Sequence, residues 1–315
     1  MIIVTINNQT IKMKKLPFAL LAFCCGATLI SAKDYKITQN ANWMMTLNGE
    51  AFHQSRMGKF IMGKINEAPN LHQKMQGLKN AFGVDLMGIR EVYAFGTGEK
   101  DQGTAFLHGG INSKQLEGFA SLNDKVEIDE YENTKTYKFQ KGTLGILSKD
   151  SVVVASNKDL LKESLKVKSG DKKNALHTFV DSIKKQDPII SVGANLLKVS
   201  KLEKKIKPEQ EIILKKFKNM VIFLDETEDH IKISSFLQAT KSETANHLEN
   251  IFRSWPSLLA LVKGANKELD EVMQNVEFSV TRDGKTVGIT TLVSHAFFES
   301  KVEEELEKKK KKRED

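Results

Sequence analysis

Apolar side chains recur along the chain with two periods, one typical of helices and one typical of strands. Between residues 57 and 82 they return every three or four positions, which predicts two successive amphipathic helices. The side chains that form these two stripes are Met57, Phe60, Ile61 and Ile65 in the first and Leu71, Met75, Leu78 and Phe82 in the second.

Strand patterns dominate the following residues. The segments IREVYAF and GTAFLHG have the length and composition of strands, and a short helix is expected over residues 113–122. Apolar and polar residues alternate over 126–129 and 136–140, which indicates strands with one solvated face and favours antiparallel pairing. SVVVAS then predicts a buried strand, and NKDLLKESLKVK predicts a helix capped by Asn157.

Five glycines in YAFGTGEKDQGTAFLHGG raise the question of a phosphate-binding loop. Gly98 and Gly103 have the right spacing, but Thr104 stands where that motif has its lysine. A phosphate-binding loop also leads into a helix, whose N-terminus holds the phosphate, and here a second strand follows. We therefore expect a hairpin whose glycines allow positive φ angles.

After KSGDKKN the order of elements begins again. DPIISVGANL resembles the earlier strand ANWMMTLNG, and Pro208 predicts the start of a helix ahead of EQEIILKKF. NMVIFLDE and HIKISSFLQA form the next expected strand pair. VEFSVTRDGKTVGITTLVS predicts a hairpin that turns at Asp283 and Gly284, and SHAFFESKVEEEL predicts a closing helix.

The helix between these two strand pairs has its own signals. TKSE, from Thr240 to Glu243, has the spacing of a capping box. Trp255 and Pro256 are expected to end the helix after Arg253 and to bury the indole beside LLALV; an exposed aromatic platform for a ligand is the alternative. The side chains expected on one face of this helix are Ala245, Leu248, Ile251 and Phe252.

These elements predict an α+β fold in which a unit of antiparallel sheet with packed helices is duplicated. We place the first half at residues 33–170 and the second at 171–307. The order of elements supports the duplication, whereas the segment lengths do not match uniformly.

The pattern resembles uncharacterised bacterial exported proteins built from two tandem α+β halves. ANWMMTLNGEAF, IREVYAFGTG and SVVVASNKDLLKESL carry the resemblance, which extends over nearly the whole mature chain. These segments are packing patterns, so the resemblance implies a fold and an exported location but no functional residues.

Residues 13–32 have the layout of a signal peptide. Lys14 and Lys15 precede an apolar run that is too short to span a bilayer comfortably, and small residues follow it. We expect cleavage after Ala32, with Ala27 as the alternative. Residues 1–12 are interpreted as a start-site error before Met13, or else as a genuine extension.

Both cysteines of the chain, Cys24 and Cys25, fall inside this leader. Because Phe23 precedes Cys24, a lipoprotein signal is disfavoured. The mature chain would then contain no cysteine, which excludes disulfides, thiolate metal sites and cysteine nucleophiles. We expect a periplasmic or secreted protein without a transmembrane helix in its mature form.

The net charge of +8 lies mostly at the two ends of the chain. Without the three lysines of the leader it falls to +5, and the last eight residues carry +4 of that. The folded body is therefore close to neutral, and we expect no nucleic-acid partner. The tail at residues 308–315 can extend the preceding helix through Glu–Lys pairs four residues apart, or it can contact an anionic lipid, an envelope polymer or an acidic protein. Its basic residues are Lys308, Lys309, Lys310, Lys311, Lys312 and Arg313.

Motifs for catalysis, metal binding and cofactor binding are missing from the sequence. It contains neither His-Glu-x-x-His nor Gly-x-Ser-x-Gly. DETEDH at residues 225–230 is interpreted as a solvated turn, with a weak calcium site as the alternative. We expect the histidines, which have no ligand spacing, on the surface or on helix faces: His53, His72, His108, His177, His230, His247 and His295.

The sequence therefore predicts an exported binding or scaffold protein of the cell envelope, without cofactor and without catalytic residues. One alternative is an envelope hydrolase whose active site is assembled from distant residues. The other is a carrier or chaperone for apolar clients that uses faces rich in methionine, such as Met57, Met62 and Met75. Methionines at helical spacing more often belong to the core.

Overall fold

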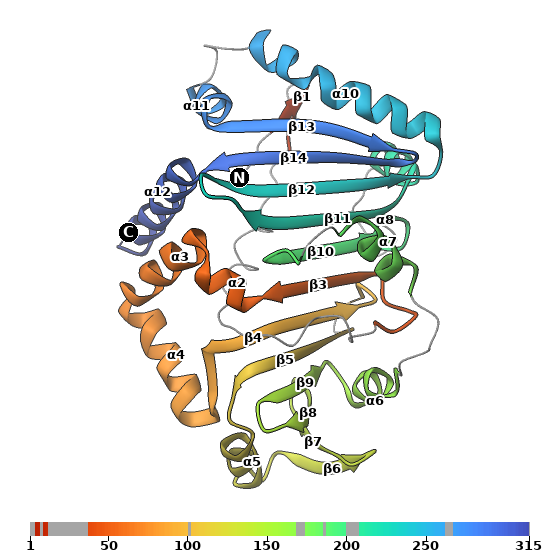
Figure 1. The fold of residues 1–315 in the computed structure, drawn as a ribbon. Helices are drawn as coiled ribbons and strands as arrows, with labels where there is room; N and C mark the ends of the chain where they lie inside the picture. The colour runs from red at the N-terminus through yellow and green to blue at the C-terminus, as the bar shows by residue number, and fades with distance from the viewer. Residues whose placement is uncertain are drawn as a thin grey trace.

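The fold, obtained as a computed structural model, is described for residues 4–6, 9–11, 37–99, 102–167, 174–184, 187–199, 208–261 and 267–314. Over these ranges one antiparallel sheet of twelve strands runs through the molecule in the order β13-β14-β12-β11-β10-β3-β4-β5-β9-β8-β7-β6 (Figure 1). β1 (Val4–Ile6) and β2 (Gln9–Ile11) pair separately. The strands of the large sheet are β3 (Trp43–Asn48), β4 (Val84–Gly96), β5 (Gly103–Ile111), β6 (Glu127–Tyr131), β7 (Thr134–Phe139), β8 (Gly142–Ser148), β9 (Ser151–Ala155), β10 (Ile190–Asn195), β11 (Phe217–Glu226), β12 (His230–Ala239), β13 (Val276–Asp283) and β14 (Thr286–Ser294).

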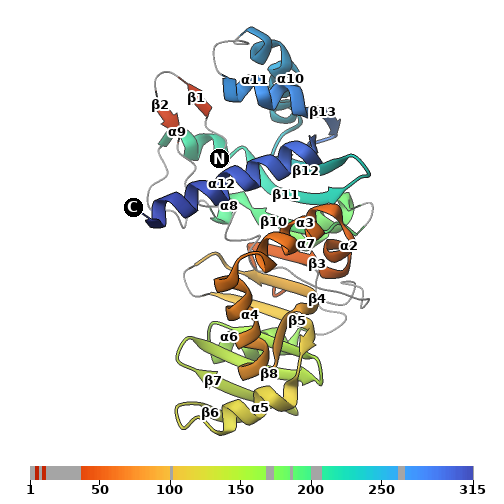
Figure 2. The same ribbon diagram turned by 90° about the vertical axis from the view of Figure 1, so that its left-hand side faces the viewer.

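Helices lie on both faces and at one end of this sheet. In Figures 1 and 2, α3, α4 and α12 gather at one end of the strands, and α10 extends past the β13 edge. The helices of the described residues are α2 (Gly49–Gln54), α3 (Arg56–Asn66), α4 (Pro69–Phe82), α5 (Ser113–Ser121), α6 (Lys158–Lys166), α7 (Ala175–Ile183), α8 (Leu196–Val199), α9 (Pro208–Leu214), α10 (Ser242–Leu261), α11 (Lys267–Asn275) and α12 (His295–Glu314).

The two halves expected from the sequence meet at β3 and β10, so they contribute to one continuous sheet. Met44 faces Gly193 across this junction, and the hydroxyl oxygens of Thr46 and Ser191 lie 2.6 Å apart. The two halves are therefore joined by ordinary antiparallel pairing between β3 and β10.

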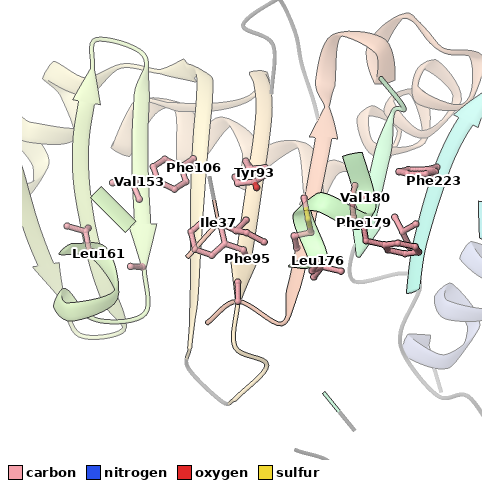
Figure 3. Packing of buried hydrophobic residues seen from close by; sticks show 14 residues of the cluster. Ile37, Tyr93, Phe95, Phe106, Val153, Leu161, Leu176, Phe179, Val180 and Phe223 are labelled. Carbon is pink, nitrogen blue, oxygen red and sulfur yellow. The ribbon is translucent and has the colours of Figure 1, made fainter. Parts of the chain in front are cut away.

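One face of the sheet is covered by α6 and α7. Side chains alternate between the two faces of a strand, so Tyr93 and Phe95 of β4 point to this face while Val92 points to the other. Figure 3 shows the helix side chains directed at the sheet. The members of this core that are labelled there are Ile37, Tyr93, Phe95, Phe106, Val153, Leu161, Leu176, Phe179, Val180 and Phe223.

The opposite face is packed by α2 and α3. Phe52, Met57 and Met62 form a core with Leu47 and Val92, and these side chains are almost completely buried. The helical stripe predicted from Met57 thus lies in the core, as methionines at that spacing suggest. The two methionines are therefore unavailable as an exposed surface for apolar clients.

Several elements are missing from the sequence-based assignment, among them α2, α11, β8 and α7. β8 contains two glycines, which weaken a strand pattern, and a Cβ at Gly145 would lie 3.0 Å from Val153 Cγ1. The sequence around α7 does carry a helical signal, with Leu176, Phe179 and Val180 on one buried face. Asn174 caps this helix by accepting the Leu176 N–H at 2.8 Å.

Most other predicted elements are confirmed, including both helices over residues 57–82 and the β4–β5 hairpin at the glycine-rich loop. Three details are wrong. The last hairpin turns at Gly284 and Lys285, because Asp283 already pairs with Thr286. Thr240 is not the N-cap of a capping box, because α10 begins at Ser242 and its first turn bonds back to the Lys241 carbonyl; the Thr240 hydroxyl donates to the Lys216 carbonyl at 3.0 Å. α10 continues through Pro256, as described below.

Candidate functional site

The apolar residues of α10 fall on two sides of the helix. Ala245, Leu248 and Phe252 face the sheet, where they pack against Val280 and Val287. Ile251, Trp255 and Leu258, which follow one another at spacings of four and three residues, are 54%, 43% and 54% exposed. These three side chains, which we call the α10 surface, form a solvent-facing apolar stripe.

This arrangement differs from the sequence-based expectation at two residues. Ile251 does not share the buried face with Ala245, and Trp255 is exposed beside Phe252, with the ring centroids 5.2 Å apart. Pro256 does not end the helix, which continues to Leu261. The alternative interpretation, an exposed aromatic side chain on this segment, is the one that fits the structure.

An ion pair between Glu249 and Arg282 holds α10 against the edge strand, and a second pair, within the helix, orients Glu249. Glu249 Oε2 accepts from Arg282 Nε of β13 at 2.5 Å, and Glu249 Oε1 lies 2.9 Å from Arg253 Nη2. The hydrogen bond from Arg282, followed by that from Arg253, lowers the pKa of Glu249. The α10 surface is thus presented on a helix that is fixed to the sheet by both apolar and charged contacts.

The basic tail belongs to α12, which extends to Glu314 as the Glu–Lys spacing predicts. Lys308 Nζ lies 2.5 Å from Glu304 and 3.3 Å from Glu305. These bonds raise the pKa of Lys308. The side chains of Lys309, Lys310, Lys311, Lys312 and Arg313 lie outside the described part of the structure, as do the proposed leader and the boundary near residue 170.

A buried polar group lies at the turn between β8 and β9. His108 Nδ1 is 2.7 Å from Ser151 Oγ, and the two side chains are nearly inaccessible. Asp150 accepts from Ser148 at 2.9 Å and from Ser151 at 3.3 Å, and it pairs with Arg90. Burial lowers the pKa of His108. A neutral imidazole beside a hydroxyl is the arrangement that activates serine nucleophiles.

A second buried ionisable group lies on the neighbouring strand. Glu91 of β4 pairs in register with His108 of β5, and within the described part of the chain its Oε2 is buried without a hydrogen-bond partner. Burial raises the pKa of Glu91 to about 7, with Lys184 opposing and Asp187 adding to the effect. The pKa of Tyr93, two residues along the same face, is also raised by burial.

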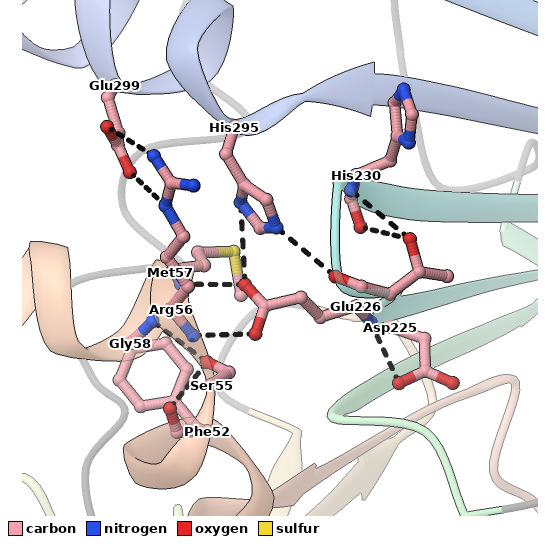
Figure 4. Close-up of polar contacts among 11 residues, drawn as sticks. Phe52, Ser55, Arg56, Met57, Gly58, Asp225, Glu226, His230, His295 and Glu299 are labelled. Atoms are coloured by element: carbon pink, nitrogen blue, oxygen red, sulfur yellow. Dashed lines mark hydrogen bonds and ion pairs between the residues drawn. The ribbon is translucent and has the colours of Figure 1, made fainter.

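A third polar cluster joins α3, β11 and α12 (Figure 4). Glu226 accepts the backbone N–H groups of Arg56 and Met57 at 2.6 and 2.7 Å, and His295 Nδ1 lies 3.6 Å from its Oε1. Arg56 forms two bonds to Glu299, at 2.9 and 3.2 Å. The carboxylate of Glu226 therefore caps the N-terminus of α3, so it belongs to the structural frame.

Sequence reasoning missed this role. DETEDH was expected to be a solvated turn, and it does connect β11 to β12, but Glu226 at its start is largely buried. The expectation that the histidines lie on the surface or on helix faces is wrong for His108, a buried strand residue, and His295 is 2% exposed. No local pattern marks these contacts, because Arg56 and Glu226 are separated by 170 positions.

Within the described residues no three His, Cys, Asp or Glu side chains converge so as to hold a metal ion. Their helices also include none that is both long enough and apolar enough to cross a membrane.

No protein-family model and no curated protein matches the chain. Among solved structures, three crystal forms of TP0453, a Treponema protein, are similar to it. Form III gives a TM-score of 0.46 at 9% identity and covers 89% of this chain and 95% of TP0453. Form IV gives 0.48 at 9%, covering 85% and 96%, and form I gives 0.42 at 10%, covering 89% and 94%. The likeness concerns the fold, and no residue role follows from it.

Proposed function

We propose that this chain is an exported binding protein of the bacterial cell envelope, and that the α10 surface is its contact site. The observation that carries the proposal is the exposure of Ile251, Trp255 and Leu258 in one row on a helix that is otherwise fastened to the sheet. Clustered apolar side chains on a surface are typical of sites that bind partners, and tryptophan is enriched where binding energy is concentrated.

The location and the domain organisation are part of the same proposal. The signal-peptide layout of residues 13–32 supports export. A mature chain without cysteines is compatible with an oxidising as well as a reducing compartment. The strand order β3-β4-β5-β9-β8 in one half corresponds to β10-β11-β12-β14-β13 in the other. In each half a helix follows the strand of the series that comes last in the sequence, α6 after β9 and α12 after β14, which supports a duplicated unit.

Capture from envelope extract with the mature chain tests the binding role. We expect one component to be retained at high salt, because apolar contacts are not screened, and to be lost when Ile251, Trp255 and Leu258 are all changed to serine. The matched control changes Leu71 and Leu78 of α4, which are 48% and 37% exposed, to serine. A chain that ends at Leu306 lacks the basic tail. It should fail to retain only those components that high salt also releases, because the tail binds through charge.

Two results would contradict the proposal. Retention that is unaffected by the three α10 substitutions would remove the α10 surface from the binding site. If nothing is retained even at low salt, the binding role itself has no support.

An envelope hydrolase is the second candidate, favoured by the contact between His108 and Ser151. A fluorophosphonate probe, which reacts with activated serines, would label the wild-type chain and not Ser151→Ala if this pair is catalytic. Equal labelling of the two chains would exclude Ser151 as the nucleophile.

A further inference from the structure

A small pocket lies at the β6 end of the sheet, away from α10. It has a volume of about 120 Å³ and is lined by residues of β6, β7, β8 and the first residue of α6. Its polar side chains come from four separate elements, and those of the three strands lie side by side on one face of the sheet. They are Glu127, Asp129, Thr136, Lys138, Thr143 and Lys158.

The floor of the pocket consists of two threonines. Thr136 and Thr143 are 3% and 2% exposed, and Thr143 Oγ1 is buried without a hydrogen-bond partner among the described residues. Buried hydroxyls are nearly always hydrogen-bonded, so an unpaired one that lines a pocket indicates a place where another polar group can bind.

The rim carries two ion pairs, and both of their carboxylates belong to β6. Lys138 Nζ of β7 lies 2.8 and 2.9 Å from the carboxylate oxygens of Glu127 on β6, and Lys158 pairs with Asp129. The hydrogen bond from Lys158 lowers the pKa of Asp129. The charges cancel in pairs, yet each lysine keeps N–H donors and each carboxylate keeps lone pairs for a further partner.

We propose that this pocket binds a vicinal diol, such as the one at the end of a saccharide or in a free polyol. A hydroxyl group both donates and accepts, so it can bond to a carboxylate and a lysine of the rim without breaking either ion pair. Its neighbour on the next carbon lies over the side chain of Thr143 and can bond to Oγ1 once a rim side chain shifts, because that atom is covered in the present structure. A charged ligand would instead have to displace a lysine or a carboxylate from its present partner. The volume limits the bound part to a few non-hydrogen atoms.

Amide chemical shifts of the full mature chain, labelled with ¹⁵N, test this inference. Glycerol, which has adjacent hydroxyls, should shift the amides of Asp129, Thr136 and Thr143 in a saturable way. 1,3-Propanediol has the same carbon chain but separated hydroxyls, and we expect it to bind at least fivefold more weakly. Methyl α-D-mannopyranoside distinguishes a saccharide from a free polyol as the natural ligand, because a saccharide site would bind it more tightly than glycerol.

Variants connect any binding to the pocket. Thr143→Val removes the unpaired hydroxyl while leaving the shape of the side chain nearly unchanged, and it should weaken binding at least fivefold. Thr290→Val, on β14 in the other half of the sheet, is the matched control and should have no effect. Lys158→Met provides a second variant in case Thr143→Val alters β8.

Three outcomes would overturn the inference. The first is shifts that grow linearly with concentration, and the second is equal shifts with the two small diols. The third is unchanged binding by both Thr143→Val and Lys158→Met. None of these measurements depends on the α10 surface.

Discussion

At the scale of single residues, Glu91 connects burial with pH dependence. Its ordinary pKa of 4.5 rises to about 7 in the folded protein because the carboxyl group is desolvated. The folded state therefore keeps this proton at pH values where the unfolded state has released it. Glu91 therefore makes its full contribution to the free energy of unfolding below about pH 4.5. This contribution is lost as the pH rises through 7.

We expect Glu91→Gln to increase the free energy of unfolding at pH 8 by roughly 1–3 kcal/mol and to change it little at pH 4. Urea unfolding at the two pH values measures this difference. Glu228→Gln, at the exposed tip between β11 and β12, is the control and should leave both values unchanged. Parallel pH profiles for the wild type and Glu91→Gln would contradict the role given to Glu91.

Glu226 provides a second test among single residues. Glu226→Ala leaves the first two N–H groups of α3 without their acceptor, so we expect the free energy of unfolding to fall by about 2 kcal/mol. Arg56→Ala breaks only the exposed pair with Glu299 and should cost much less. Thermal unfolding of both variants gives the comparison, and similar losses would argue against a capping role for Glu226.

At the scale of elements, α10 depends on packing that overrides its local sequence. Pro256 lacks the N–H that would bond to the Phe252 carbonyl, and its ring crowds the preceding turn. The helix continues because its first turns are fixed on the sheet through Ala245, Leu248 and Phe252. We expect Pro256→Ala to raise the free energy of unfolding by about 1–3 kcal/mol, measured in urea. Ser257→Ala is the matched control. No gain in Pro256→Ala would mean that the helix does not benefit from the added bond.

Most of these elements could be predicted from the sequence because their signals are local. The stripe at Met57 and the alternation in VEFSV depend only on neighbouring positions. The exposure of Trp255 is only one of two alternatives from the sequence, because which side of α10 is covered depends on how the helix packs on β13 and β14. The proximity of Glu226 and His295 likewise depends on the arrangement of whole strands and helices, which no local pattern encodes.

At the scale of the whole molecule, one sheet shared by both halves has a consequence for folding. β3 and β10 each have a strand on both sides, and Leu47 and Ile190, which face each other across the junction, are buried. Separation of the halves would expose two unpaired strand edges and the apolar side chains beside them.

We therefore expect residues 33–170 and 171–315, expressed separately, to aggregate or remain unfolded, whereas co-expression should give a one-to-one complex. Size-exclusion chromatography with light scattering and far-UV circular dichroism measures both outcomes. The intact chain should unfold in a single transition, because strand pairing couples the halves. Two stable monomeric halves would show that each unit folds around its own core, and the β3–β10 ladder would then be a docking contact between two independent domains.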